Sequence, residues 1–348
     1  MSINIQIALH EYYTHEFPDN EWIHINNVHR FSDGWETEIF AFDIESGQAG
    51  ERTHEELILR IYSGAGGTND SAREFRGMRL LHECGYPVPK VQLHGDDDSP
   101  FGAPFVIMDR IPGQVMGQVM KNAPQEAMRD LLSQFCELFV NLHTLDWYPF
   151  VDSFEQFNKN DPYQFADYWI NTGKQGIQQY QLQGFSEALD WFAERRELIP
   201  CSQPSVVHLD FHPNNVLLRP DGQAFVIDWS QVSLSDARFD LAWTLVLASA
   251  YNGEEWRDQI LAGYENYLGE KIDGIGLFEA FACTHRLFIV VASLTHGVAT
   301  FGMRPDTVES MRQQMGSLSN VYNRLQTITG IKIPEVDHLL GETSIPIL

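Results

Sequence analysis

The sequence predicts an α+β protein in two parts, and three observations lead to this fold class. Short strand-like runs fill the N-terminal third of the chain, helical periodicity dominates the rest, and a group of short apolar strands interrupts the helices between residues 206 and 228. The rhythm changes at Pro112-Gly113. We therefore expect a small sheet-plus-helix lobe over residues 1–112 and a mainly helical lobe over residues 113–348.

The N-terminal lobe carries strand-like runs and one helix. The runs are separated by turn formers such as Asp33-Gly34 and Ser46-Gly47. A helix is predicted from about residue 71 to residue 84, where Gly85 and Pro87 end it. The predicted strands are residues 23–28, 38–44, 56–62, 89–94 and 105–109.

The C-terminal lobe shows apolar residues at helical spacing, as in the stripe of Leu131, Leu132, Phe135, Leu138, Phe139 and Leu142. The exception is a set of short apolar runs at residues 206–207, 215–218 and 224–227, with the turn Pro220-Asp221-Gly222 between the last two. A strand hairpin inside a helical lobe is where we expect the chemistry.

The charge of the chain favours a small-molecule partner. The 23 basic and 48 acidic side chains leave a formal charge of −25, which repels nucleic acid and anionic membrane. A cationic or neutral hydroxylated substrate is therefore favoured, although an acidic surface also serves solubility alone. We expect no nucleic-acid partner and no membrane partner.

The cysteines and the N-terminus point to the cytoplasm. The four cysteines show neither the CxxC spacing of a metal site nor the density of a disulfide scaffold, so we expect free thiols in a reducing compartment. The first residues lack a basic stretch followed by an apolar one, and no uninterrupted apolar run reaches about 18 residues.

The strongest functional signal lies in the strand hairpin and the loop before it. The loop reads His208-Leu209-Asp210-Phe211-His212-Pro213-Asn214-Asn215, and the hairpin ends on Val226-Ile227-Asp228-Trp229. Phosphoryl transfer needs an oriented acceptor hydroxyl and Mg²⁺ held across the phosphates. One carboxylate for the hydroxyl and an Asn/Asp pair for the metal ion would supply both.

These two segments resemble the catalytic and metal-binding loops of the aminoglycoside phosphotransferase and choline kinase family, which has a protein-kinase-like fold. The resemblance implies Asp210 as catalytic base, Asn215 and Asp228 as Mg²⁺ ligands, and His208 as a structural member of the loop. It extends to Ser235-Asp236-Ala237-Arg238-Phe239-Asp240-Leu241-Ala242, where Asp240 would brace the catalytic loop. We expect His212 to support the site rather than to react.

In the N-terminal lobe the family pattern requires a basic residue on the third strand for the nucleotide phosphates, and Arg60 stands there. Arginine can grip phosphate at two places. Glu74 would pair with Arg60 and fix its direction. The alternative is a capping box, in which Ser71 begins the helix and Glu74 bonds back to its start.

Two further segments are expected to contact the nucleotide. The loop around Gly34 would cover the phosphates with backbone N–H groups. The segment from Met108 to Arg110 resembles the hinge of the family, whose backbone would bond to adenine; an edge strand and linker would look the same.

The acceptor site is expected in the C-terminal lobe. Glu254, Glu255 and Asp258 form an acidic cluster near a helix start and could bind a substrate, although acidic residues there also complement the helix dipole. A cationic ammonium group could be boxed by aromatic residues, which are more often core: Tyr163, Tyr168, Trp169, Trp243 and Trp256.

The sequence thus predicts an ATP-dependent or GTP-dependent kinase that uses Mg²⁺ and phosphorylates a hydroxyl of an aminoglycoside, an amino alcohol, a sugar or a related metabolite. One alternative is a catalytically silent nucleotide-binding regulator of the same fold. Another is a metal-dependent hydrolase in which His208, Asp210 and His212 hold the metal ion. The acceptor, the choice of nucleotide and the oligomeric state stay open.

Overall fold

The computed structural model describes residues 3–31, 37–48, 50–62, 67–153, 158, 160–297, 308, 311 and 315–342. The chain forms two compact units. The first unit contains Met1–Val115 and Val216–Gln231, and the second contains Met116–Asn215 and Val232–Leu348.

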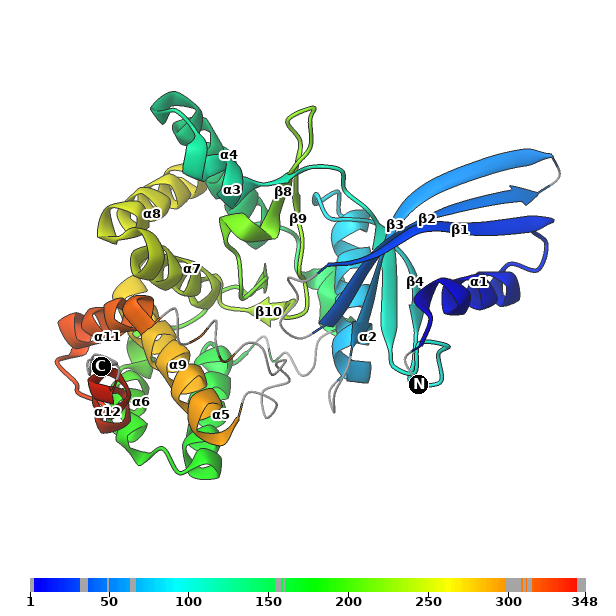
Figure 1. Cartoon of the computed structure of the whole chain (residues 1–348). Coiled ribbons are helices and arrows are strands. Elements are labelled where there is room, and N and C mark those ends of the chain that lie inside the picture. Colours follow the sequence, from blue (N-terminus) through cyan, green and yellow to red (C-terminus); the bar gives the residue numbers. More distant parts are fainter. Residues whose placement is uncertain are drawn as a thin grey trace, which may run out of the picture. The chain divides into compact units, whose positions relative to one another are not determined.

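A five-stranded antiparallel sheet forms the centre of the first unit (Figure 1). Its spatial order is β1-β2-β3-β5-β4. The strands are β1 (Trp22–Phe31), β2 (Thr37–Gln48), β3 (Glu51–Tyr62), β4 (Val91–Gly95) and β5 (Phe105–Asp109).

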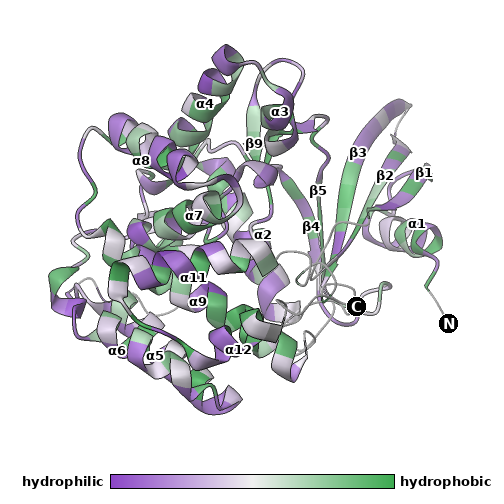
Figure 2. Cartoon of the chain, turned by 60° about the vertical axis from the view of Figure 1, so that its left-hand side comes forward, coloured by the Kyte–Doolittle hydropathy of each residue, from purple (hydrophilic) through white to green (hydrophobic). Residues whose placement is uncertain are grey.

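The two faces of this sheet carry different helices, α1 (Ile5–Glu16) and α2 (Gly67–Glu83), on its opposite sides (Figure 1). Residues 57, 59 and 61 of β3 share an apolar core with α1. Because successive strand residues point to opposite faces, Arg60 points away from that core and toward α2. The outer end of β3 is polar and exposed, as Figure 2 shows.

A segment from much later in the chain completes the first unit. β8 (Val216–Leu218) and β9 (Ala224–Val226) form the expected hairpin, and β8 pairs with β6 (Gln114–Val115). The backbone N–H of Val226 donates to the carbonyl of Pro87 at 2.8 Å. The hairpin therefore groups with residues 1–115 by backbone pairing, whereas we expected it in the lobe that begins at residue 113.

The second unit is helical. Its α-helices are α3 (Met116–Asn122), α4 (Gln125–His143), α5 (Gln164–Tyr180), α6 (Ser186–Ala193), α7 (Ala237–Asn252), α8 (Glu254–Leu268), α9 (Ile275–His296), α11 (Met315–Thr329) and α12 (Pro334–Glu342). Short 3₁₀ turns are η1 (Tyr148–Ser153), η2 (Gln183–Phe185), η3 (Arg196–Leu198) and η4 (Pro213–Asn215), and β7 (Ser205–Val207) pairs with β10 (Ser233–Ser235).

Helix α9 lies in the core of this unit and packs against α7 and α11. By length and composition it is the one helix of the described residues that could cross a membrane, and 61% of its apolar window is buried inside the protein. The core helix of a globular domain has the same character.

Several expected boundaries differ from the observed ones. Helix α2 begins at Gly67 instead of residue 71. Helix α1 was not predicted at all, although these residues share one apolar helix face: Ile5, Ala8, Leu9, Tyr12 and Tyr13. The run at residues 206–207 pairs with β10 and not with the hairpin. Asn215 ends a 3₁₀ turn and does not begin the next strand.

A buried ion-pair network joins the helices around α9. The Glu279 carboxylate, 1% exposed, accepts hydrogen bonds from Arg257 Nε and Nη2 at 2.9 and 2.7 Å, and from Arg324 Nη2 at 2.9 Å. Removing one partner of such a network leaves an uncompensated buried charge.

Glu279→Ala is therefore expected to lower the free energy of unfolding by about 3–5 kcal/mol. Urea unfolding followed by circular dichroism measures this loss. Glu255→Ala, on the exposed side of α8, is the control and should change the stability by less than about 0.5 kcal/mol. Equal effects of the two substitutions would contradict the structural weight given to Glu279.

Candidate active site

Arg60 is the centre of a group of charged side chains in the first unit. Its Nη1 donates to Glu74 Oε1 at 2.7 Å, and its Nη2 donates to Asp228 Oδ1 at 2.9 Å and to Thr37 Oγ1 at 3.4 Å. The Tyr62 hydroxyl donates to the other oxygen of Glu74. One guanidinium group thus contacts residues of β2 and α2 and Asp228, which lies two residues after β9.

The surroundings of Arg60 keep it charged. Burial alone lowers the pKa of its guanidinium, but Glu74, Tyr62 and Asp228 outweigh burial and raise it. Burial raises the pKa of Glu74, and the charge of Arg60 opposes that shift. At 2.7 Å from a guanidinium, the Glu74 carboxylate stays ionised.

The contacts of Glu74 distinguish the two roles considered for it. Ser71 lies in the second turn of α2, and its hydroxyl donates to the carbonyl of Thr68 at 3.1 Å. A capping box needs Ser71 at the start of the helix. Glu74, fully buried and bonded to Arg60, forms the ion pair instead.

Asp228 combines exposure with an unusual backbone. Its side chain is 44% exposed, and its φ of 66° lies in the left-handed region that non-glycine residues seldom adopt. The next residue, Trp229, is fully buried, and its indole N–H donates to the Val226 carbonyl at 2.9 Å. This anchor holds Asp228 in a strained turn of the kind that clusters at functional sites.

The other residues predicted to contact the nucleotide in this unit are Gly34, Met108 and Arg110. Gly34 lies outside the described residues. Met108 is buried in β5, and the backbone N–H of Arg110 donates to the Glu56 carbonyl at 2.9 Å. The N–H of Asp109 donates to Lys90. Because these two N–H groups are engaged, a hinge contact would have to use other backbone groups, and the hinge assignment stays a prediction.

The second unit holds its central loop through Asp240. This carboxylate is fully buried; Oδ2 accepts from His208 N at 2.6 Å and Oδ1 from Leu209 N at 2.9 Å. His143 Nε2 lies 3.2 Å from Oδ2. Leu209 has a φ of 62°, so the two hydrogen bonds stabilise a conformation that a leucine rarely adopts.

Asp210 follows this strained residue and carries three side-chain contacts. Its Oδ1 accepts from the Trp243 indole N–H at 3.0 Å. Its Oδ2 accepts from Asn215 Nδ2 at 3.3 Å and lies 3.4 Å from His212 Nε2. The side chain is 40% exposed, so the carboxylate is held in place and still open to a substrate.

These contacts keep Asp210 ionised. Partial burial raises its pKa, but the hydrogen bond and the charge of His212, together with Trp243 and His208, outweigh burial and hold the pKa well below its usual range. Such a weakly basic carboxylate is suited to orienting a hydroxyl group.

The two histidines of the loop have different positions. His208 is fully buried, its Nδ1 accepts the backbone N–H of Asp210 at 3.2 Å, and its ring packs edge-on against Phe211. Within the described residues, no group of three His, Cys, Asp or Glu side chains is arranged to hold a metal ion. His208 is thus turned into the loop, which speaks against the hydrolase alternative.

Asn215 and Asp228 have the donor atoms that a hard cation prefers. The amide nitrogen of Asn215 donates to the backbone carbonyl of Asp210 at 3.0 Å and to its side chain. This fixes the amide so that its oxygen is the group left for a ligand. Asp228 offers an exposed carboxylate. Oxygen ligands of this kind fit Mg²⁺, and the metal role of both residues stays a prediction.

The acidic cluster at the start of α8 has partners within its own unit. Glu254 accepts from Ser249 Oγ at 2.6 Å and from Arg324 Nη1 at 3.2 Å, and Asp258 accepts from Arg257 Nη1 at 2.6 Å. Glu255 is exposed. These contacts within the protein explain the positions of two of the three carboxylates, Glu254 and Asp258, and a bound substrate is not needed to explain them.

The role of the aromatic residues considered for an ammonium group stays a prediction. Trp169 is partly buried and contacts Phe239, Phe281 and His285, and its ring meets that of the exposed Tyr168 at 5.4 Å. Tyr163 stacks on Arg196, with 4.5 Å between the guanidinium carbon and the ring centre.

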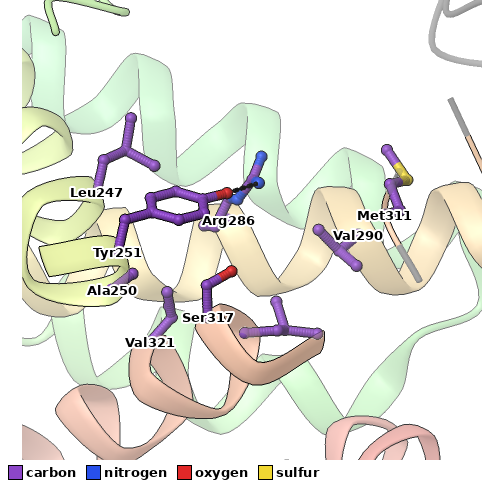
Figure 3. A pocket seen from close by; sticks show the side chains of 9 residues that line it. Leu247, Ala250, Tyr251, Arg286, Val290, Met311, Ser317 and Val321 are labelled. Atoms are coloured by element: carbon purple, nitrogen blue, oxygen red, sulfur yellow. Dashed lines mark hydrogen bonds between the residues drawn. The ribbon is translucent and has the colours of Figure 1, made fainter. Parts of the chain in front are cut away.

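A small hollow lies elsewhere in the helical unit, between α7, α9 and α11. Figure 3 shows Leu247 and Tyr251 of α7 and Arg286 and Val290 of α9 around it, with Arg286 Nη2 donating to the Tyr251 hydroxyl at 3.2 Å. None of the residues predicted for catalysis lines it. The candidate site is therefore defined by the loop around Asp210.

Three contributors were missed at the sequence level: Thr37, His143 and the hydrogen-bonding role of Trp243. Trp243 follows Asp240 by three residues on α7, a spacing that places both on one helix face. That signal could have found it. Thr37 and His143 have no such spacing, because each meets its partner only through tertiary packing.

The sequence model of the phosphotransferase enzyme family matches residues 27–275, more than half of the chain. The chain belongs to this family. The phosphotransferase family expected from the loops around Asp210 and Asp228 is thereby confirmed.

Solved structures show the same fold over nearly the whole chain. A Ralstonia eutropha JMP134 protein assigned as an aminoglycoside phosphotransferase has a TM-score of 0.68 and 17% identity, covering 94% of this chain and 98% of its own. APH(2")-IIa in complex with gentamicin has a TM-score of 0.58 and 17% identity, covering 96% and 99%. The GDP complex of aminoglycoside 2'-phosphotransferase-IIIa gives 0.58 and 16%, covering 94% and 99%. The α+β, kinase-like fold is thereby confirmed.

Two relatives are much longer proteins. Acyl-CoA dehydrogenase family member 10 of Mus musculus is 25% identical over 182 residues, which are 49% of this chain and 16% of that protein. Acyl-CoA dehydrogenase family member 11 of Pongo abelii is 25% identical over 187 residues, 49% of this chain and 22% of that protein. The match thus spans less than a quarter of either relative.

Arg60→Ala is expected to weaken nucleotide binding more than Glu74→Ala does, because the first removes the cation and the second only its orientation. The double variant should lose less affinity than the sum of the two single losses, since the residues share one ion pair. Calorimetric titration with nucleotide measures this coupling. Arg79→Ala, on the exposed face of α2, is the control; additive losses would show that the ion pair has no part in binding.

Proposed function

We propose that this chain transfers the γ-phosphate of Mg²⁺-bound ATP or GTP to a hydroxyl group of an aminoglycoside, an amino alcohol, a sugar or a related metabolite. The observation that carries the proposal is the Asp210 loop, in which a buried Asp240 fixes the backbone and Trp243, Asn215 and His212 surround an ionised, half-exposed carboxylate. Complexes of structural neighbours with GDP, ADP and aminoglycosides support it.

Arg60 is proposed to bind the nucleotide phosphates. It is held by Glu74 and Asp228 and keeps its charge, and its Nε is buried without a hydrogen-bond partner among the residues described. An unsatisfied N–H on a fixed guanidinium is the kind of donor that a phosphate oxygen would satisfy.

Asp210 is proposed to orient the acceptor hydroxyl. A carboxylate oxygen accepts the hydroxyl hydrogen, which directs the oxygen lone pair toward the γ-phosphorus. The hydroxyl oxygen forms the new bond to phosphorus while the bond to the departing diphosphate breaks, and the proton passes to Asp210 late in the step. The low pKa of Asp210 agrees with this order, since it favours the proton on the substrate until the new bond forms.

Asn215 and Asp228 are proposed to bind Mg²⁺ through the amide oxygen and the carboxylate. When bound, the ion would neutralise phosphate charge. Each acceptor group is already oriented by a hydrogen bond within its own unit, Asn215 by Asp210 and Asp228 by Arg60.

Asp210→Asn is expected to lower turnover by roughly two to four orders of magnitude, the usual contribution of a positioned general base. Nucleotide affinity should change little, because Arg60 and the metal residues are intact. A screen of gentamicin, kanamycin, choline, ethanolamine and common sugars for nucleotide consumption identifies the acceptor for this assay. Near-normal turnover of a folded Asp210→Asn protein would refute the catalytic assignment.

Nucleotide should raise the melting temperature modestly without Mg²⁺ and more with it, because binding stabilises the folded state in proportion to affinity. Asp228→Ala is expected to abolish the Mg²⁺-dependent increment. Asp221→Ala, in the turn of the same hairpin, should keep it. The metal role of Asp228 is excluded if both variants behave like the unsubstituted protein.

A further inference from the structure

Trp243 contacts the Asp210 carboxylate from α7, outside the loop. Its indole N–H donates to Oδ1 at 3.0 Å. Trp243 follows Asp240 by one helical turn of α7, so the helix that fixes the backbone of the loop through Asp240 also contacts the side chain of Asp210.

The two oxygens of Asp210 are thereby distinguished. Oδ2 faces Asn215 and His212, both of which belong to the loop itself. Oδ1 is contacted by a residue from outside the loop, and this contact is shorter than those of Oδ2. A carboxylate held at both ends has a fixed plane, because rotation about its last side-chain bond would break one of the two sets of contacts.

The indole is itself held in position by packing. Trp243 makes an edge-on contact with His285 of α9, with ring centres 5.8 Å apart. The His285 ring stacks on Phe281 with 10° between the planes and meets Trp169 at 5.3 Å. Burial lowers the pKa of His285 to about 4, so this support is uncharged at neutral pH. The donor is thus presented by a packed aromatic group.

We propose that Trp243 is a positioning residue of the phosphoryl transfer: its indole N–H fixes the plane of the Asp210 carboxylate and thereby the direction in which the acceptor hydroxyl is held. This inference rests on the proposed function, in which Asp210 orients that hydroxyl. Trp243 acts through Asp210 and contributes to turnover rather than to nucleotide binding.

A pair of substitutions separates the hydrogen bond from the packing. Trp243→Phe keeps much of the ring bulk and loses the N–H. Trp243→His loses the outer ring but places an N–H at the corresponding position of its five-membered ring. Turnover is measured at pH 8, where a histidine is neutral, with the best acceptor of the screen of gentamicin, kanamycin, choline, ethanolamine and sugars.

Trp243→Phe is expected to lower kcat by roughly 10- to 100-fold, the range that a misplaced catalytic group costs, with the nucleotide KM unchanged within about twofold. Trp243→His should recover most of the loss. A purely structural role predicts the opposite order, since histidine leaves the larger cavity. Trp191→Phe, where the indole stacks on Arg195, is the control for loss of an indole ring. The proposal is overturned if Trp243→Phe leaves kcat unchanged, or if kcat is lower in Trp243→His than in Trp243→Phe.

A second measurement needs no acceptor. In protein labelled with ¹⁵N-tryptophan, the Trp243 indole resonance is assigned by its loss in Trp243→Phe, and Asp210→Asn should move it upfield, because an amide oxygen is a weaker acceptor than a carboxylate. An unmoved resonance overturns the hydrogen bond.

The two failures are distinguishable. If the resonance moves but Asp210→Asn keeps full turnover, the proposed role of Asp210 is wrong, and the role of Trp243 goes with it. If Asp210→Asn is inactive and Trp243→Phe is fully active, only the role of Trp243 is wrong. In the double variant, Trp243→Phe should add little to the loss caused by Asp210→Asn, since both act through one carboxylate; additive losses overturn the proposal.

Discussion

The fully buried Asp240 carboxylate is the constraint on which the catalytic loop depends. A buried charge is stable only when hydrogen bonds surround it. Asp240 obtains them from the backbone of His208 and Leu209 and from His143 on α4. To provide these donors, Leu209 adopts a left-handed conformation, and this turn in the chain directs Asp210 outward. The exposed position of Asp210 therefore results from the hydrogen bonds that stabilise the buried Asp240.

In the first unit, too, a buried charge is surrounded by hydrogen-bond partners, but here the charge is positive. Arg60 is a buried cation on a strand, and Glu74, Thr37 and Asp228 come to it from α2, β2 and the turn after β9. Asp228, like Leu209, has a positive φ beside a buried anchor. In the first unit the buried Arg60 is bonded to Asp228, whose own backbone is strained. In the second unit the buried Asp240 holds the strained Leu209, which precedes Asp210.

The sequence was sufficient for the parts of the site that lie in short contiguous segments. The loop around Asp210 and the hairpin before Asp228 were placed by local composition and by resemblance, and the sheet was placed by short strand-like runs between turn formers. The start of α2 was missed because the polar residues after Gly67 show no apolar period. The role of Trp243 was missed because an aromatic residue on an apolar helix looks like core, and its spacing of three residues from Asp240 was not used.

The chain leaves the first unit after Val115 and returns to it for Val216–Gln231. Its N-terminal portion is thus incomplete when it leaves the ribosome: β6 has no β8 to pair with, and Arg60 has Glu74 but no Asp228. At about 5–20 residues per second, the missing segment follows on the order of ten seconds later. During that interval α3, α4, α5 and α6 of the second unit are synthesised, whereas α7, which holds the Asp210 loop through Asp240 and Trp243, follows only after Gln231. The two units therefore mature together, and neither is finished before the other is well advanced.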